Sequence, residues 1–240
     1  MSIAESPATS GDRSGTLTRQ RVLEAAVELA DRHGVEAVSM RRLGQELGIE
    51  AMSLYTHVRS KDDLLDGMVE VAFGEVPALV RDGDWKASLR RTILDARDVL
   101  LRHPWAPGVI ETRTAPGPAL LAHYDRVMGI LREGGFSVEM THHALHLLGS
   151  RLVGFTRELF DDSPDLSADE AAAFAEQLRP TLPWVAEMAV AGTHDGGLGG
   201  CDTNLEFAFS LDVVLDGLER LRDASQPGFA ADAQTDASGG

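Results

Sequence analysis

The chain has 240 residues, of which 43% are hydrophobic and 25% charged, a composition typical of a soluble globular protein with a buried core. No apolar run approaches the roughly 18 residues that a membrane-spanning helix needs, and residues 1–15 lack the apolar core of a signal peptide. The single cysteine, Cys201, excludes an intramolecular disulfide and a cysteine-rich zinc site, so we expect a cytoplasmic protein.

The net charge of −16, taken over the whole chain, argues against a nucleic-acid partner. The charge is distributed unevenly, however. Residues 13–61 carry eight Lys or Arg and only six Asp or Glu, so the excess acid lies almost entirely beyond them. This asymmetry predicts two domains, at 16–62 and 63–223. We expect the polar segments at the two ends, 1–15 and 224–240, to be disordered.

Four helices are predicted in the first third of the chain, because apolar residues recur there at helical spacing between capping residues and glycines. Their predicted ranges are 17–33, 40–47, 50–57 and 60–76. The capping and stop residues are Thr18, Gly34, Ser39, Gly48 and Ser60.

The remainder of the chain is also read as helices separated by turns. The predicted ranges are 86–102, 118–133, 137–160, 167–178, 180–191 and 203–222, with an irregular piece at 107–115. No segment has a convincing strand pattern. We therefore predict an all-α fold, with an N-terminal three-helix helix-turn-helix domain and a larger helical domain.

The short helix at 50–57 is unusually polar. Its spacing from the preceding helix, through Gly48, is that of a helix-turn-helix, whose second helix enters the DNA major groove. Leu54 and Val58 are expected to face the first helix and hold the unit together. The alternative is a small helical bundle with a solvated polar helix. The residues free to meet DNA are Met52, Ser53, Tyr55, Thr56 and His57, with Arg41 suited to guanine and Ser39, Tyr55 and Lys61 suited to phosphates.

The stretch LTRQRVLEAAVELADRHGVEAVSMRRLGQELGIEAMSLYTHVRSKDDLLDGM resembles the N-terminal domain of TetR-family transcriptional regulators, and its LYTHV run is closest to the tetracycline-repressor branch. The C-terminal half resembles the same branch more loosely, through the stretches RHPW, GILREGGFS, LVGFTRE and FAFSLDVVLDGLERL. The resemblance implies that Ser39 meets a phosphate, that Arg41 reads a base and that Lys61 clamps the DNA backbone. It also implies that Ala51, Met52 and Ser53 lead the recognition helix while Tyr55 and His57 touch phosphate and flanking bases.

This sequence departs from the tetracycline repressor at Ala51, Met52 and Thr56, where the repressor has larger polar and aromatic groups. The operator sequence therefore cannot be carried over. Ala and Met side chains can still contact thymine methyl groups.

The resemblance further implies a C-terminal domain that dimerises and binds a small molecule. Apolar stripes on two helices are the predicted dimer interface, which a two-fold symmetric dimer would use to bind a palindromic operator. The alternative is that both stripes are buried within one subunit. The predicted interface residues are Leu148, Leu152, Phe155, Phe207, Leu211, Val214, Leu215 and Leu218.

Aromatic and Met side chains with a few polar neighbours suit a largely apolar effector, although each residue singly could be plain core. The predicted ligand residues are His103, Trp105, Ile110, Met128, His142, His146, Leu147, Arg151 and Trp184. His142 and His146 share a helical face at metal-ligand spacing, but no third ligand is paired with them, so we predict no metal site and no cofactor.

These features together predict a ligand-responsive DNA-binding regulator, which we expect to be a repressor that releases its operator when the effector binds. An enzyme built on His142, His143, His146, Asp161 or Asp162 is not supported, because the sequence has no nucleophile elbow, phosphate-binding loop or metal triad. The other alternative, favoured by the net charge of −16, is a helical ligand- or protein-binding module without sequence-specific DNA binding.

Overall fold

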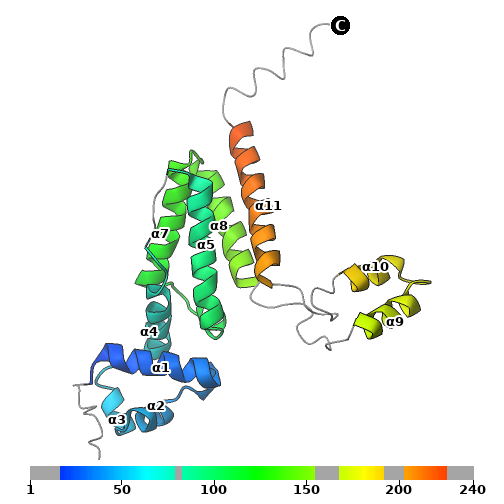
Figure 1. The fold of residues 1–240 in the computed structure, drawn as a ribbon. Coiled ribbons are helices and arrows are strands. Elements are labelled where there is room, and N and C mark those ends of the chain that lie inside the picture. The colour runs from blue at the N-terminus through cyan, green and yellow to red at the C-terminus, as the bar shows by residue number, and fades with distance from the viewer. Residues whose placement is uncertain (1–16, 79–82, 155–167, 192–202, 226–240) are drawn as a thin grey trace, which may run out of the picture.

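The computed structural model describes residues 17–78, 83–154, 168–191 and 203–225, and within them it is all-α, as predicted (Figure 1). The helices are α1 (Arg19–His33), α2 (Met40–Leu47), α3 (Ala51–Leu54), α4 (Lys61–Gly74), α5 (Trp85–Arg102), α6 (Ala106–Glu111), α7 (Pro118–Glu133), α8 (Val138–Gly154), α9 (Ala168–Leu178), α10 (Pro183–Ala191) and α11 (Thr203–Ala224), with a short 3-10 helix η1 (Val35–Ala37) after α1. None of the described helices combines the length and apolarity that crossing a membrane requires.

Side-chain caps start the N-terminal helices at the predicted residues. The hydroxyls of Thr18, Ser39 and Ser60 accept hydrogen bonds from backbone N–H groups three residues on, at 3.2, 3.2 and 3.0 Å. Each cap satisfies a backbone donor that the first helical turn leaves open. Gly48 ends α2 with a φ of 69°, in the left-handed region that glycine adopts without steric cost.

Two predicted ranges were wrong. The helix expected at 50–57 is α-helical only over Ala51–Leu54, because the following N–H groups of Tyr55 and Thr56 bond to carbonyls three residues back rather than four. The piece expected to be irregular at 107–115 contains α6. Pro107 lies in its first turn, where a missing N–H costs no intrahelical hydrogen bond.

Helix α4 connects the two parts of the molecule. It packs against α1 at the N-terminal end and against α7 in the larger bundle of α5, α7, α8 and α11 (Figure 1). The domain boundary predicted at residues 62 and 63 falls in its first turn. Any change in the bundle that displaces α4 therefore acts directly on α1.

The apolar stripe predicted to form a dimer interface lies in the core of a single subunit instead. The buried members are Leu148, Phe207, Leu211, Leu215 and Leu218, with Val214 partly buried. Polar contacts hold this face of α11 on α5: Arg97 stacks over the Phe207 ring, and Arg90 Nε lies 2.7 Å from Asp212 Oδ1. The side chains of Leu152 and Phe155 lie outside the described residues. The structure thus favours the alternative in which these apolar side chains are buried within one subunit.

Candidate nucleic-acid interface

Helices α2 and α3 approach each other closely because of two glycines. A Cβ atom added at Gly44 would lie 2.8 Å from the Ile49 carbonyl oxygen, inside van der Waals contact. The Ile49 N–H donates to the Gly44 carbonyl at 2.9 Å, and Gly48 supplies the left-handed turn between them. Glycine at these positions therefore fixes the angle at which α3 leaves α2.

The segment from Ala51 to Val58 divides its residues as predicted between an inner and an outer face. Leu54 and Val58 are fully buried, whereas the side chains of Met52 and Tyr55 are 72% and 46% exposed. Ser53 and Thr56 are exposed, and Ala51 and His57 are half-buried. This short segment, which begins with α3, thus presents hydrogen-bonding groups and one flexible apolar side chain to the exterior.

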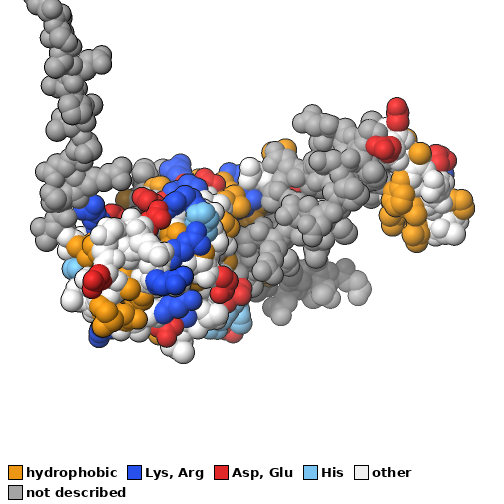
Figure 2. Space-filling view, turned by 90° about the horizontal axis from the view of Figure 1, so that it is seen from below, with side chains coloured by type: hydrophobic (Ala, Val, Ile, Leu, Met, Phe, Trp, Pro, Cys, Tyr) orange, Lys and Arg blue, Asp and Glu red, His pale blue; other side chains and the backbone are white. Residues whose placement is uncertain are grey.

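Basic side chains surround this polar face. Ser39, Arg41 and Lys61 are exposed at the starts of α2 and α4, and Arg59 is exposed between α3 and α4. Figure 2, which views the molecule from the side of α2 and α3, shows a stripe of Lys and Arg side chains running across this end. Phosphate groups on both sides of a groove are the natural counterpart of such a stripe.

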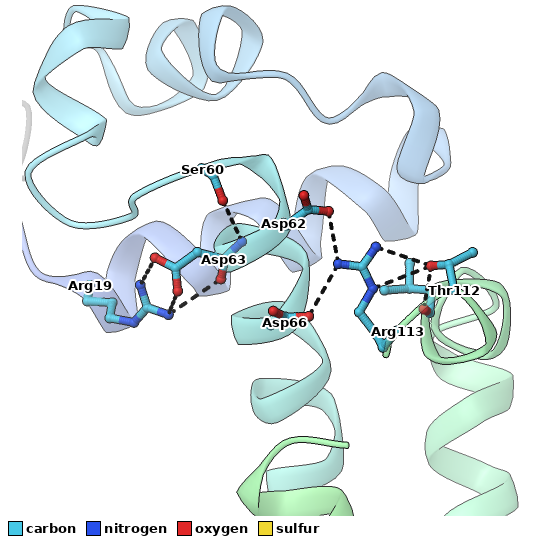
Figure 3. A network of polar contacts seen from close by, with 8 residues as sticks. Arg19, Ser60, Asp62, Asp63, Asp66, Thr112 and Arg113 are labelled. Carbon is cyan, nitrogen blue, oxygen red and sulfur yellow. Dashed lines mark hydrogen bonds and ion pairs between the residues drawn. The ribbon is translucent and has the colours of Figure 1, made fainter. Parts of the chain in front are cut away.

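An ion pair from α1 to α4 positions the loop before Lys61 (Figure 3). Arg19 donates two hydrogen bonds to the Asp63 carboxylate, at 2.8 and 3.1 Å, and a third to the His57 carbonyl at 2.9 Å. The Arg59 N–H also donates to Asp63, at 2.8 Å. The Arg19 and Arg59 hydrogen bonds lower the pKa of Asp63. The sequence pattern did not reveal this role, because the contact joins residues 44 positions apart in the chain.

A second ion pair reaches the same end of α4 from the larger bundle. Arg113, just after α6, lies 3.0 Å from Asp62 and 3.3 Å from Asp66 (Figure 3). Burial lowers the pKa of Arg113, but the hydrogen bonds that its guanidinium donates to the two carboxylates outweigh burial, so the net shift is upward. The first two turns of α4 are therefore held from both sides, by Arg19 and by Arg113.

A cavity of about 440 Å³ opens beside this contact, between α4, the segment 113–118 and α7. Its walls include Glu70, Ile110, Arg113 and Tyr124, and burial raises the pKa of the Tyr124 phenol. Its volume is in the range of small-molecule sites. Of the predicted ligand residues, Ile110 lines it.

The structure does not bring the other predicted ligand residues together. His103 and Trp105 are buried against Asp31 of α1, and Met128 is half-buried on α7. The remaining members stand exposed on other helices: His142, His146 and Leu147 on α8, and Trp184 on α10. The Arg151 side chain lies outside the described residues. These assignments stay predictions.

The rings of His142 and His146 do lie together, with centroids 4.5 Å apart. Among the described residues, no group of three or more His, Cys, Asp or Glu is arranged to hold a metal ion.

Comparison with known proteins places these features in context. Residues 22–68 match the family described as bacterial regulatory proteins, tetR family, and residues 77–222 match the tetracyclin repressor-like C-terminal domain. The chain is 33% identical over 215 residues to the HTH-type transcriptional repressor DrrR1 of Streptomyces coeruleorubidus, covering 86% of this chain and 78% of that protein. It is 29% identical over 206 residues to the class A tetracycline repressor of Escherichia coli, covering 84% and 90%.

Among solved structures, the chain is similar to the TetR family protein ActR of Streptomyces coelicolor in complex with actinorhodin. The TM-score is 0.67 at 27% sequence identity, over 88% of this chain and all of that one.

Proposed function

Because the chain belongs to the TetR family of bacterial transcriptional regulators, we propose that it is a cytoplasmic repressor that holds a palindromic operator as a homodimer and releases it when a small molecule binds. The observation that carries this proposal is the exposed polar face of the segment 51–57, set among basic side chains on an otherwise acidic protein. Transcriptional regulators of this kind are not enzymes, and we propose no catalytic role for any residue.

In this proposal the recognition segment lies in the major groove. The planar guanidinium of Arg41 donates two hydrogen bonds to a guanine, and Met52 and Ala51 contact thymine methyl groups. Ser53, Thr56 and His57 supply shorter polar contacts to base edges and their flanks. Ser39, Tyr55 and Lys61 bind phosphates, which fix the register of the helix on the duplex.

A second copy of the chain supplies the other half-site. The outer face of α11 exposes Phe209, Val213 and Leu221, with Phe209 67% exposed. Large apolar side chains along one helix face are costly in water and are typical of a subunit interface. We propose this outer face in place of the buried stripe as the α11 contribution to the dimer.

The cavity beside α4 is the proposed effector site. ActR was solved in complex with actinorhodin, and the class A relative is named a tetracycline repressor. A ligand among Ile110, Leu120 and Tyr124 would touch the segment that carries Arg113, and through it the start of α4. The ligand shifts the balance between DNA-binding and released states only by its difference in affinity for the two.

Selection from a random duplex library at near-physiological salt tests the proposal. The wild-type protein is expected to enrich a two-fold palindrome, and Arg41→Ala should relax the base preference at one position of each half-site. Binding without a motif, lost as salt rises, would instead support the alternative of a helical ligand- or protein-binding module that does not read sequence.

A further inference from the structure

Glu70 of α4 carries an unpaired carboxylate oxygen in the wall of the cavity beside α4. Its Oε2 accepts a hydrogen bond from the Ala119 N–H in the first turn of α7, at 2.8 Å. Its Oε1 is buried and, among the described residues, has no hydrogen-bond partner. Buried polar atoms in folded proteins are nearly always paired, so an unpaired carboxylate oxygen in a cavity wall is suited to a donor on a ligand.

A capping role for Glu70 explains only half of its carboxylate. Gly117 precedes α7 and has no side chain with which to cap it, so Glu70 supplies that hydrogen bond from α4. The amide oxygen of a glutamine can accept the same hydrogen bond without carrying a charge. The cap therefore accounts for Oε2, and it leaves Oε1 and the negative charge to a ligand.

The cations that line the same cavity are already paired with other carboxylates. Arg19 lies 2.8 Å from Asp63, and Arg113 pairs with two aspartates of α4 at 3.0 and 3.3 Å (Figure 3). Within the described part of the chain, no Lys or Arg pairs with Glu70. A cation in the cavity therefore gains an attraction that a neutral molecule of the same shape does not.

The remaining lining is largely apolar. Val69, Ile110 and Leu120 contribute hydrocarbon surface, and Tyr124 contributes an aromatic ring. A volume of about 440 Å³ accommodates a body of a few fused rings. The cavity thus combines an apolar enclosure with one uncompensated carboxylate.

We propose that the effector is an amine, with an apolar, ring-containing body and a protonated nitrogen whose N–H groups donate to Glu70. The proposal deepens the proposed effector site and rests on it. The terminal torsion of a glutamate side chain is broad, so a small rotation of the carboxyl group turns Oε1 toward the ligand. Hydrogen bonds between two charged groups are roughly twice as strong as those between neutral ones, so Glu70 should select for the charge.

Gly117 provides the space in which this oxygen lies. A Cβ atom added there would overlap Oε1 and would lie 3.0 Å from the Glu70 carboxyl carbon. The backbone φ of Gly117 is −78°, which any residue adopts, so Gly117→Ala strains no torsion. The added methyl group should displace the carboxylate without removing its charge.

The test measures binding to the full-length protein without DNA, by fluorescence titration at neutral pH. The probes are anthracenylmethylamine, which is cationic, and anthracenylmethanol, which has the same rings and no charge. The wild-type protein should bind the amine at least about tenfold more tightly than the alcohol. Equal affinities, a preference for the alcohol, or no binding of either probe would overturn the proposal.

Glu70→Gln should remove the preference for the amine, because its amide oxygen keeps the hydrogen bond from Ala119 while the charge is lost. Glu111→Gln is the matched control, since it makes the same change at an exposed residue of α6 outside the cavity wall, and it should keep the preference. A preference that survives in Glu70→Gln would show that the amine binds elsewhere. If Glu70→Gln does not fold, Gly117→Ala decides by the same criterion.

Failure of this inference can be told apart from failure of the proposed function. If selection recovers a palindrome but Glu70→Gln keeps the amine preference, the repressor stands and the amine class is wrong. If selection recovers no palindrome but only Glu70→Gln loses the preference, the cavity binds amines in a protein that does not read DNA sequence.

Discussion

The Arg19 guanidinium and the Asp63 carboxylate join the first and fourth helices through two hydrogen bonds, 44 residues apart in the chain. Asp63→Asn should lower the free energy of unfolding by about 1 kcal/mol, since the pair is partly exposed and screened. It should also weaken operator binding, because the loop that carries His57 and Lys61 loses its anchor. Urea unfolding and anisotropy measure the two effects.

Arg19→Lys is the matched control for that pair, because it keeps the charge but loses the two-pronged geometry, and its effect should be intermediate. The lowered pKa of Asp63 gives a pH test as well. The contribution of the pair is present above the ordinary carboxyl range and is lost as the pH falls through the lowered pKa. An Asn variant as stable as wild type at neutral pH would contradict the assignment.

Substitutions at Arg41 and at Lys61 should affect different properties of DNA binding, namely base specificity and salt dependence. Arg41→Ala is expected to cost about 1–3 kcal/mol of binding and to relax specificity at one position of each half-site. Lys61→Ala should weaken all duplexes alike and reduce the slope of log affinity against log salt by about one per bound subunit. Salt titrations on matched and mutated operators distinguish the two effects. If Lys61→Ala relaxed specificity and Arg41→Ala changed only the salt slope, Lys61 would read the base and Arg41 would bind the phosphate.

Gly44→Ala tests the close approach of α2 and α3. The added Cβ would meet the Ile49 carbonyl at 2.8 Å, a backbone atom that cannot move alone. We expect a loss of about 1–3 kcal/mol in thermal unfolding, together with weaker operator binding. Gly74→Ala is the control, because its added Cβ would meet nothing within 4 Å apart from its chain neighbours and its own helix backbone, and it should be neutral or slightly stabilising.

The two faces of α11 should respond differently to substitution. Phe209→Glu with Val213→Glu places charge on the exposed face and should yield folded monomers by light scattering, with helical circular dichroism retained. Leu215→Ala removes a fully buried side chain and should cost about 2–5 kcal/mol of stability without first dissociating the dimer. A dimer that survives both Glu substitutions would place the interface elsewhere.

His123 should make the fold sensitive to acid. Burial, with a smaller contribution from Arg126, lowers its pKa from 6.5 to about 4, so the unfolded chain takes up this proton at a higher pH than the folded chain. Stability should fall as the pH drops from about 6.5 to about 4, by up to about 3 kcal/mol. His123→Leu should remove most of this loss, measured by urea unfolding at several pH values. His143→Gln should not.

Structural features that depend on residues close together in the sequence could be predicted reliably. The caps at Ser39 and Ser60 and the stop at Gly48 depend on neighbours within four residues, and the buried positions of Leu54 and Val58 follow from helical spacing. The exposed polar face of residues 51–57 was predictable for the same reason. Its partners Arg19 and Asp63 were not, because their contact depends on how α1 and α4 pack.

The orientation of α11 shows a second limit. Apolar residues occupy both of its sides, with Phe207 and Leu211 on one and Phe209 and Val213 on the other, so periodicity alone cannot tell the core from an interface. The contacts with α5 decide which side is buried. Likewise, the contacts of His103 and Trp105 depend on the position of Asp31 on a distant helix, which composition and periodicity do not reveal.

The basic stripe beneath an otherwise acidic body gives the molecule a permanent electric dipole directed along its length. In the field of a duplex such a dipole experiences a torque before any contact forms, so encounters begin with α2 and α3 facing the phosphates. Repulsion between DNA and the acidic bundle removes most unproductive side-on collisions. The charge that argued against DNA binding thus serves to orient the protein on approach, and added salt should slow association by screening that torque.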